Sequence, residues 1–275
     1  MNKVTKEHLD IDDLKVTYVD EGEGSPILLL HGWPTSSFLY RNITPVLAQQ
    51  HRVIVPDLPG FGDSSKPVDR QYSFELFAAV LDALVEQLEL EDPGLVVHDL
   101  GGPIGVHWAL HRPGRVSRLA LLNTLIYPDF DPTVLEFVTT LMDPAKREEL
   151  VSDEGLREAM RIGVSDPDSL SDEVMEGVVG PFRTAEDRQA LALAGIGLHP
   201  DGFAAIARLL PDLDIPVLGL YGTDDRILTD VAETFARVKR DLPQAEIEAM
   251  PGAGHFLQED APAVIAERLA RFFAG

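Results

Sequence analysis

The sequence predicts an α/β fold: a mostly parallel sheet with helices on both faces and a helical segment inserted between two of its later strands. Two observations support this prediction. From residue 26 to residue 124, short apolar runs of strand length alternate with amphipathic stretches of helix length, an order that is typical of a parallel sheet. From residue 127 to about residue 210 the strand-like runs vanish and helix-length pieces follow one another, until an apolar run returns at residue 215.

The early strands are predicted at residues 26–30 and 52–56, which are short apolar runs. The first run leads into the sequence His-Gly-Trp-Pro at residues 31–34. The second leads into a glycine-containing loop at residues 57–65, and an amphipathic helix is predicted over residues 73–90. The loop lacks the lysine and the third glycine of phosphate-binding loops, so we interpret it as a structural turn.

The most informative segment is the strand, turn and helix around Asp99. An apolar run at residues 95–97 is followed by Asp99, by two glycines, and by a helix-like stretch at residues 103–111. This is the setting of a nucleophile elbow, a turn that exposes one side chain above a sheet, although Val97 stands where the pattern usually has glycine. The same aspartate could instead cap the helix. A carboxylate at the apex is ionised at neutral pH and can displace a leaving group from saturated carbon without a base to activate it.

Two later strands end in further candidates for catalysis. An apolar run at residues 215–221 precedes a turn that contains Asp224 and Asp225, and an alternating run at residues 245–250 precedes a glycine-rich loop that carries His255. Nucleophile, acid and histidine therefore follow one another in the order that α/β-hydrolases use. His255 has an unperturbed pKa of about 6.5 and can act as general base toward water. Either aspartate could orient its imidazole.

The loop after residues 26–30 is predicted to supply the electrophilic half of the site. In α/β-hydrolases a backbone N–H group of this loop and the N–H group after the nucleophile form the oxyanion hole. Trp33 and Leu100 occupy these two positions. We interpret His31 as a structural histidine that ties the loop down.

The helical insert is predicted to form a cap over the strand ends, where it would exclude water and shape a substrate pocket. The predicted core comprises residues 1–126 and 211–275, and the predicted cap comprises residues 127–210. The residues expected to bind substrate lie in the cap or at its borders and are Trp33, Tyr127, Phe130, Phe137, Leu141, Phe182 and His199.

Composition restricts the expected partners. The 275 residues include 46 acidic and 23 basic ones, which leaves a formal net charge of −23. Such a charge repels nucleic acid and anionic membranes and disfavours an anionic substrate, so we expect a small neutral, apolar substrate that reacts with water. The sequence has no cysteine, no signal-peptide pattern and no apolar run of membrane-spanning length. The simplest expectation is a cytoplasmic protein that uses neither metal nor cofactor.

Together these segments resemble the α/β-hydrolase families that use an aspartate nucleophile, chiefly haloalkane dehalogenases and, second, epoxide hydrolases. The resemblance covers nearly the whole chain outside the cap. The segments most similar to dehalogenases are residues 31–37, 39–42, 61–67, 122–124, 181–182 and 253–260. The resemblance implies an eight-stranded, mostly parallel sheet whose first strands precede Pro26.

The resemblance also implies that Asp99, Asp225 and His255 form a catalytic triad. These families place the acid three residues after the glycine that ends the preceding strand, which here is Gly222. Asp224 is then expected to be a turn residue that bonds to the local backbone.

The chain departs from both families in the groups that stabilise a leaving group. Haloalkane dehalogenases carry a tryptophan directly after the nucleophile, whose indole N–H holds the halide, but Leu100 stands there and has no side-chain donor. Trp33 supplies one indole N–H at the other position that this family uses. Epoxide hydrolases protonate the opening ring with two cap tyrosines, whereas the titratable rings in or near the insert are those of Tyr127 and His199.

Three hypotheses follow. The first is a haloalkane-dehalogenase-like hydrolase that cleaves a polarised carbon–leaving-group bond through an alkyl ester on Asp99. The second is an epoxide hydrolase with an atypical acid donor from the cap. The third is a non-catalytic protein that binds a small molecule within the same fold. The complete set of three catalytic groups argues against the third hypothesis, because a receptor has no physical need for them.

Overall fold

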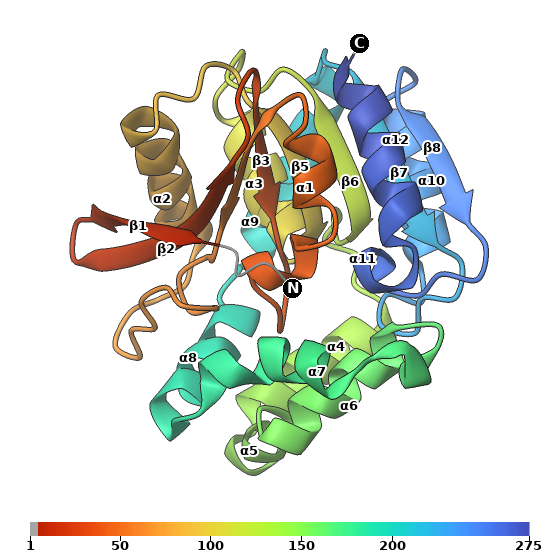
Figure 1. Cartoon of the computed structure of the whole chain (residues 1–275). Coiled ribbons are helices and arrows are strands. Elements are labelled where there is room, and N and C mark those ends of the chain that lie inside the picture. The colour runs from red at the N-terminus through yellow and green to blue at the C-terminus, as the bar shows by residue number, and fades with distance from the viewer. Residues whose placement is uncertain (1–4, 275) are drawn as a thin grey trace.

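The computed structural model describes residues 5–274 and contains one eight-stranded sheet between two layers of helices, with further helices across one edge (Figure 1). The strands are β1 (Lys6–Ile11), β2 (Leu14–Glu21), β3 (Pro26–Leu30), β4 (Arg52–Pro56), β5 (Gly94–Asp99), β6 (Leu119–Thr124), β7 (Val217–Gly222) and β8 (Glu246–Met250). Their order in the sheet is β1-β2-β4-β3-β5-β6-β7-β8. β2 runs antiparallel to β1 and β4, and all other neighbours are parallel. The predicted sheet is confirmed, including the two strands before Pro26.

The central strands face an apolar layer on each side. In β5, Leu95 and Val97 belong to the cluster beneath α2 and α3, whereas Val96 belongs to the cluster beneath α1 and α12. Successive side chains of a strand point to opposite faces, so a strand covered on both faces has to be apolar throughout. The flanking helices are α1 (Thr44–Leu47), α2 (Phe74–Gln87), α3 (Gly101–Leu110), α9 (Pro200–Leu209), α10 (Val231–Asp241), α11 (Leu257–Asp260) and α12 (Pro262–Ala274).

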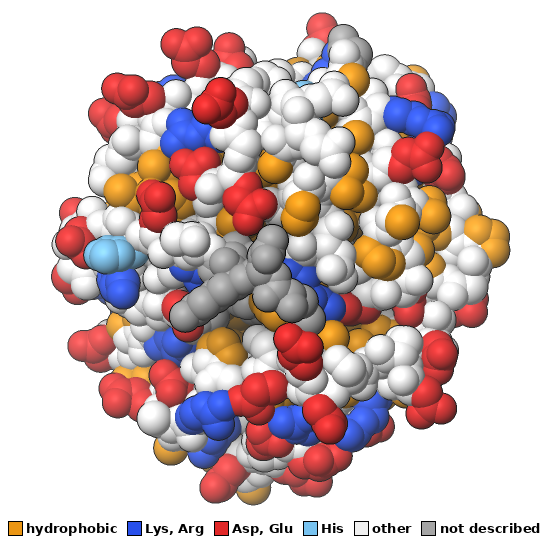
Figure 2. Space-filling model, viewed as in Figure 1, with side chains coloured by type: hydrophobic (Ala, Val, Ile, Leu, Met, Phe, Trp, Pro, Cys, Tyr) orange, Lys and Arg blue, Asp and Glu red, His pale blue; other side chains and the backbone are white. Residues whose placement is uncertain are grey.

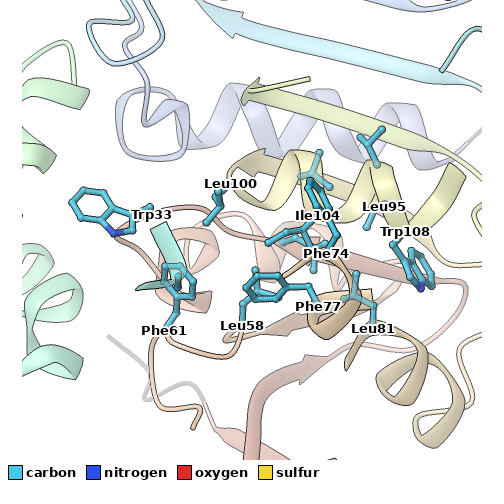
Figure 3. Packing of buried hydrophobic residues seen from close by; sticks show 14 of the residues in the cluster. Trp33, Leu58, Phe61, Phe74, Phe77, Leu81, Leu95, Leu100, Ile104 and Trp108 are labelled. Carbon is cyan, nitrogen blue, oxygen red and sulfur yellow. The ribbon is translucent and has the colours of Figure 1, made fainter. Parts of the chain in front are cut away.

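The apolar cluster beneath α2 and α3 extends to the strand ends that face the cap. Figure 3 shows Ile104 and Trp108 of α3 beside side chains of α2, and Trp33 and Leu100 at the end of the cluster nearest to the cap helices. Trp33 and Leu100 are both buried. The core therefore continues without a break into the loops on which the predicted oxyanion hole depends.

Between β6 and β7 the chain forms the predicted series of short helices, which lie across the carboxyl ends of the parallel strands (Figure 1). They are α4 (Pro132–Met142), α5 (Pro144–Leu150), α6 (Asp153–Gly163), α7 (Asp172–Val179) and α8 (Ala185–Gly195), with 3-10 turns at Pro167–Ser169 and Gly180–Phe182. Asp-Pro pairs separate several of these elements. Asp143 caps α5 through the backbone N–H groups of Ala145 and Lys146, and proline follows at the first helical position, where its missing N–H costs nothing.

The helix α9 belongs with the core rather than with the cap. It packs against α3, and its residues Phe203 and Ile206 lie in the same apolar cluster as Trp108 of α3. The predicted cap, residues 127–210, included this helix, because an amphipathic helix does not reveal in its sequence which surface it covers. By packing, the cap ends near the C-terminus of α8.

The surface reflects the acidic composition. Acidic side chains are spread over the face seen in Figure 2, and at the cap end basic side chains stand beside them. On the cap helix α6, Arg157 bonds Asp153, and Arg161 bonds Glu154 and Glu158. In the described part of the chain no single helix has the length and apolarity to span a membrane, although one bent pair, Ala185–Gly195 with Pro200–Asp212, passes that test together.

Candidate active site

Asp99 lies at the end of β5 in the conformation expected of an elbow. Its φ angle is +48°, a left-handed backbone that is uncommon for any residue except glycine. Glycines make room for this turn: a Cβ on Gly32 would collide with the Asp99 side chain. Val97, which stands where the pattern usually has glycine, is accommodated by α3, because a Cβ on Gly105 would lie 2.7 Å from Val97 Cγ1. The missing glycine of the elbow is thus offset by a glycine one turn into the helix.

The structure brings Asp99, Asp225 and His255 together. Nδ1 of His255 lies 2.9 Å from Oδ2 of Asp225, and Nε2 of His255 lies 3.6 Å from Oδ2 of Asp99. Since a carboxylate only accepts, Nδ1–H donates to Asp225, which directs Nε2 toward Asp99. Nε2 is buried and has no hydrogen-bond partner among residues 5–274. The imidazole is therefore fixed at one nitrogen and free at the other.

Asp225, rather than Asp224, is the aspartate that contacts the histidine. Oδ1 of Asp225 accepts from the backbone N–H groups of Ile227 at 2.7 Å and Leu228 at 2.8 Å. The side chain of Asp224 is exposed and accepts from the hydroxyl of Thr223. The backbone donors and the neighbouring His255 keep Asp225 ionised in spite of its burial, and the donors hold it in one orientation.

Asn123 at the end of β6 is a member of the site that the sequence analysis did not single out. It is fully buried, its Nδ2 donates to Oδ2 of Asp225 at 2.6 Å, and its Oδ1 accepts from the N–H of Gly222 at 2.9 Å. Its φ angle of +24° is unusual for asparagine. The signal available in the sequence was one polar amide at the end of the apolar run of β6.

The pKa shifts follow from these contacts. Burial alone would lower the pKa of His255, but the charges of Asp225 and Asp99 and the hydrogen bond to Asp225 raise it overall. Burial alone would raise the pKa of Asp99, yet the charge of the nearby His255 and the backbone N–H of Leu100 lower it overall. The pKa of Asp225 is lowered for similar reasons. At neutral pH both aspartates are ionised around a histidine that holds its proton.

One backbone N–H group at the predicted oxyanion position bonds the Asp99 carboxylate. Trp33 N–H donates to Oδ1 at 2.7 Å, and the backbone N–H of Leu100, at the other predicted position, helps to lower the pKa of the same carboxyl group. His31 ties this loop to the core, because its Nε2 accepts from the N–H of Leu58 at 3.0 Å while Nδ1 contacts the carbonyl of Gly32. The histidine therefore has the structural position that its sequence context suggested.

His98 supports the catalytic loop from beneath. It is fully buried, and its Nε2 donates to the backbone carbonyl of His255 at 3.0 Å. Burial lowers the pKa of His98 to about 3, and the neighbouring charge of His255 adds to this shift. A neutral ring at this position can hold the His255 loop without adding a second positive charge beside it.

A cavity of about 1230 Å³ lies above Asp99, between the strand ends and the cap. Four of the predicted substrate-binding residues line it, namely Trp33, Phe130, Phe137 and His199. The ring of His199 is largely exposed, which places this residue at the rim. Among the residues that the structure describes, no tyrosine lines the cavity.

Three residues expected to line the pocket lie elsewhere. The hydroxyl of Tyr127 donates to Asp241 at 2.7 Å, beneath the guanidinium of Arg237. Leu141 is fully buried in the packing of α4, and the ring of Phe182 faces the ammonium of Lys66. Each of these side chains points toward a packing partner and not into the cavity. That orientation depends on tertiary contacts and not on local sequence.

The cavity contains one indole donor. That indole belongs to Trp33, whose ring lines the cavity and packs edge-on against Phe137 with centroids 4.8 Å apart. Its Nε1 is buried next to Gly195 and has no partner among the described residues. The side chain of Leu100 adds an apolar surface beside it. No group of three or more histidine, aspartate or glutamate side chains within residues 5–274 is arranged to hold a metal ion.

Comparison with known proteins places these features in a wider context. A family model described as the α/β-hydrolase fold matches residues 25–262. The chain is 34% identical to a haloalkane dehalogenase of Agrobacterium fabrum, over 93% of this chain and 87% of the relative. It is 31% identical to a cis-3-alkyl-4-alkyloxetan-2-one decarboxylase of Shewanella oneidensis, over 94% of this chain and 85% of the relative. The fold is similar to that of a solved epoxide hydrolase, with a TM-score of 0.82 and 27% identity. The match spans 99% of this chain and 99% of the epoxide hydrolase chain.

Proposed function

Because the chain belongs to the α/β-hydrolase family, we propose that it is a hydrolase that acts through a covalent ester between Asp99 and its substrate. The observation that carries the proposal is a carboxylate at the apex of the elbow, with His255 beside one oxygen and the N–H of Trp33 bonded to the other. A carboxylate that is already ionised can attack carbon directly. The charge of the chain and the apolar side chains of the cavity favour a neutral, apolar substrate.

In the first step an oxygen of Asp99 attacks the substrate carbon. We assign this role to Oδ2, because Oδ1 is held by the N–H of Trp33. The new carbon–oxygen bond forms as the bond to the leaving group breaks, and the leaving group departs with the bonding electron pair. Oδ1 becomes the carbonyl oxygen of the ester, already placed against its donors.

In the second step water hydrolyses the ester. Nε2 of His255 takes a proton from water while the water oxygen bonds to Cγ of Asp99. Negative charge develops on Oδ1, where the N–H groups of Trp33 and Leu100 stabilise it. The product alcohol leaves with the proton from His255, and the regenerated carboxylate keeps one oxygen from water.

Ester formation also prepares the base. In the free enzyme the charge of Asp99 contributes to the raised pKa of His255. The ester is neutral, so this contribution disappears and the pKa of His255 falls at the point where a neutral imidazole is required. Asp225 remains ionised and stabilises the imidazolium that forms.

The dehalogenase-like variant of this reaction is favoured by the donor in the cavity. A departing halide needs a hydrogen-bond donor in a dry site, and Nε1 of Trp33 is buried there without a partner. The 34% identity to a haloalkane dehalogenase supports the same choice. With Leu100 after the nucleophile, one side-chain donor replaces the two that dehalogenases use, which favours substrates with an easy leaving group such as bromide.

Epoxide hydrolysis is the second candidate, because the fold is also similar to that of an epoxide hydrolase. Opening of the ring needs a proton at the departing oxygen, and the titratable ring at the cavity rim is His199. The two candidates share the ester and differ in the leaving group. A screen of short bromoalkanes, terminal epoxides and dialkyl oxetan-2-ones, in which release of halide, diol or carbon dioxide is followed, separates them.

The covalent route is tested by turnover in oxygen-18 water. Because water attacks Cγ of Asp99, repeated turnovers should place the label in the Asp99 side chain, seen by mass spectrometry of the peptide that contains it. Asp99→Asn is the matched control and should give neither turnover nor label. Sustained turnover by the unmodified protein with no label in that peptide would exclude the ester.

A further inference from the structure

The cavity extends well beyond Asp99. Besides the strand-end residues it is lined by residues of α4, α5 and α6 and by the segment of residues 195–203. Its volume of about 1230 Å³ exceeds the roughly 300–1,000 Å³ typical of pockets for small organic ligands. A short haloalkane beside Asp99 would leave most of this space to water.

The outer part of the cavity has apolar walls that reach the surface. Leu135 of α4 is 50% exposed and Ile162 of α6 is 41% exposed, and both line the cavity. They are two of the five large apolar side chains that are exposed in residues 5–274. Leu150 and Ala159 continue the apolar lining between them. An apolar ligand that covered these side chains would remove them from water.

Charge at the rim limits what such a ligand can be. Four glutamates line the outer cavity, at positions 136, 149, 154 and 158, against the two cations Lys146 and Arg226. Arg161 pairs with Glu154 and Glu158, so the four glutamates and three cations leave one negative charge in excess at the rim. A ligand with an anionic end, such as a fatty acid, would meet repulsion there.

We infer that the site takes a neutral substrate with a long unbranched alkyl tail, whose reactive carbon lies at Asp99 and whose tail runs beside α4 to Leu135 and Ile162. The reactive end of this substrate rests on the proposed function. The tail rests on the continuity of one apolar cavity from Asp99 to two exposed side chains of the cap.

Primary alcohols of increasing length test the tail separately from the chemistry, because they bind without reacting. Calorimetric titration with 1-butanol, 1-hexanol, 1-octanol and 1-decanol should show affinity rising by about threefold per methylene, as each added group leaves water. An affinity that stops rising at 1-butanol would overturn the inference.

Two surface variants locate the tail. Leu135→Glu and Ile162→Glu place a charge in the outer cavity and should each weaken 1-decanol binding by at least tenfold while 1-butanol binding stays unchanged. Met142→Glu is the matched control, because Met142 also lies on α4, is 65% exposed and does not line the cavity. Equal weakening by all three variants, or weakening of 1-butanol and 1-decanol alike, would contradict the assignment.

The outcomes also separate this inference from the proposed function. Chain-length-dependent binding in a protein whose Asp99 takes up no oxygen-18 would support binding of an alkyl tail in the outer cavity and reject the ester. Labelled Asp99 together with length-independent binding would support the ester and reject the alkyl tail.

Discussion

The floor of the cavity comes from the ends of five neighbouring strands, β3, β5, β6, β7 and β8, whereas its roof comes from helices inserted between β6 and β7. The reactive side chains of the floor are buried, and their orientation is fixed by hydrogen bonds such as those of Asp225 to Asn123 and to two backbone N–H groups. In the roof, α4 buries only Val134 and Leu141, and α5 buries no residue. Directional bonds fix the chemistry, while the roof offers mainly apolar surface that can adapt to different substrates.

The roof is nevertheless anchored on one side. The carbonyl of Gly163, at the end of α6, accepts from the N–H of Phe256 at 3.0 Å. Asp260 accepts from the N–H groups of both Ser165 and Gly254 and so joins the cap to the loop that carries His255. The α4 and α5 side has fewer buried contacts, and segments with few buried contacts open at lower free energy. If the cap moves, we expect movement at α4 and not at the end of α6, which is hydrogen-bonded to the loop that carries His255.

The largest expected effect comes from removing the base of the floor. His255→Phe should leave ester formation intact, because Asp99 needs no base, but should stop hydrolysis of the ester. The variant should release one equivalent of leaving group and accumulate substrate mass on the Asp99 peptide. Circular dichroism checks that the fold survives, since Asp225 keeps its bonds to Asn123, Ile227 and Leu228. A folded variant that turns over continuously would assign the base to another group.

A nearly equal effect on turnover is expected from replacing Asp225, the acid that contacts His255. In Asp225→Asn the amide oxygen should stay on the side of the Ile227 and Leu228 N–H groups, so the new NH₂ faces both Nδ1 of His255 and Nδ2 of Asn123. The imidazole is then held in the wrong tautomer, which costs on the order of 10⁴-fold in turnover in a comparable triad. The unsatisfied donor of Asn123 should also lower the free energy of unfolding by about 1–3 kcal/mol. Asp224→Asn is the control and should be close to wild type in kcat and Tm, because its side chain is exposed; equal losses in both would refute the assignment.

The two half-reactions should also differ in their dependence on pH. The pKa of Asp99 lies below its ordinary value, so the nucleophile stays ionised and the burst of leaving group should be nearly constant between about pH 5 and 8. Hydrolysis needs neutral His255 in the ester, so its rate should fall as pH decreases through the pKa of that histidine, by about tenfold per pH unit. Rapid-quench measurements separate the two steps. A burst rate that falls in parallel with hydrolysis would show that ester formation also requires an unprotonated His255.

Sequence alone could predict the floor because its signals are local. The sequence itself contains apolar runs of strand length and, around Asp99, a strand followed by a glycine-rich turn. It also contains three polar residues at strand ends in the order that α/β-hydrolases use. Asn123 lies in a segment that resembles dehalogenases, residues 122–124, but it received no role because a single amide after a buried strand has no pattern of its own. Its role depends on β6 and β7 lying side by side, which only the assembled sheet shows.

The roof was harder to predict because its contacts, like those of Asn123, depend on tertiary packing and not on local sequence. Its helices were predicted as a series of helix-length pieces, but the face that each helix turns to the cavity is set by packing. Phe137 lines the cavity, whereas Leu141, on the same face one turn later, is fully buried because it packs against Gly195 of α8. α9, which lies inside the predicted cap, packs against α3, because an apolar stripe fits a core helix and a cap helix equally well.

The smallest expected effect concerns Leu100, which lies where floor and roof meet and lines the cavity beside Trp33. Leu100→Trp should raise halide release from bromoalkanes, because a second indole N–H would face the departing ion, and one well-placed donor is worth about 2.7–4 kcal/mol in a dry site. Crowding by the larger ring offsets about 1–3 kcal/mol, which the open volume of the cavity should keep at the low end. We therefore expect a gain of several-fold for bromide and less for chloride, with epoxide opening unchanged. Trp33→Phe should act in the opposite direction, because it removes the indole N–H and keeps the backbone N–H at Asp99. A folded Leu100→Trp protein that releases no halide, beside a parent that opens epoxides, would reject the dehalogenase-like reaction and leave the shared ester chemistry of the floor in place.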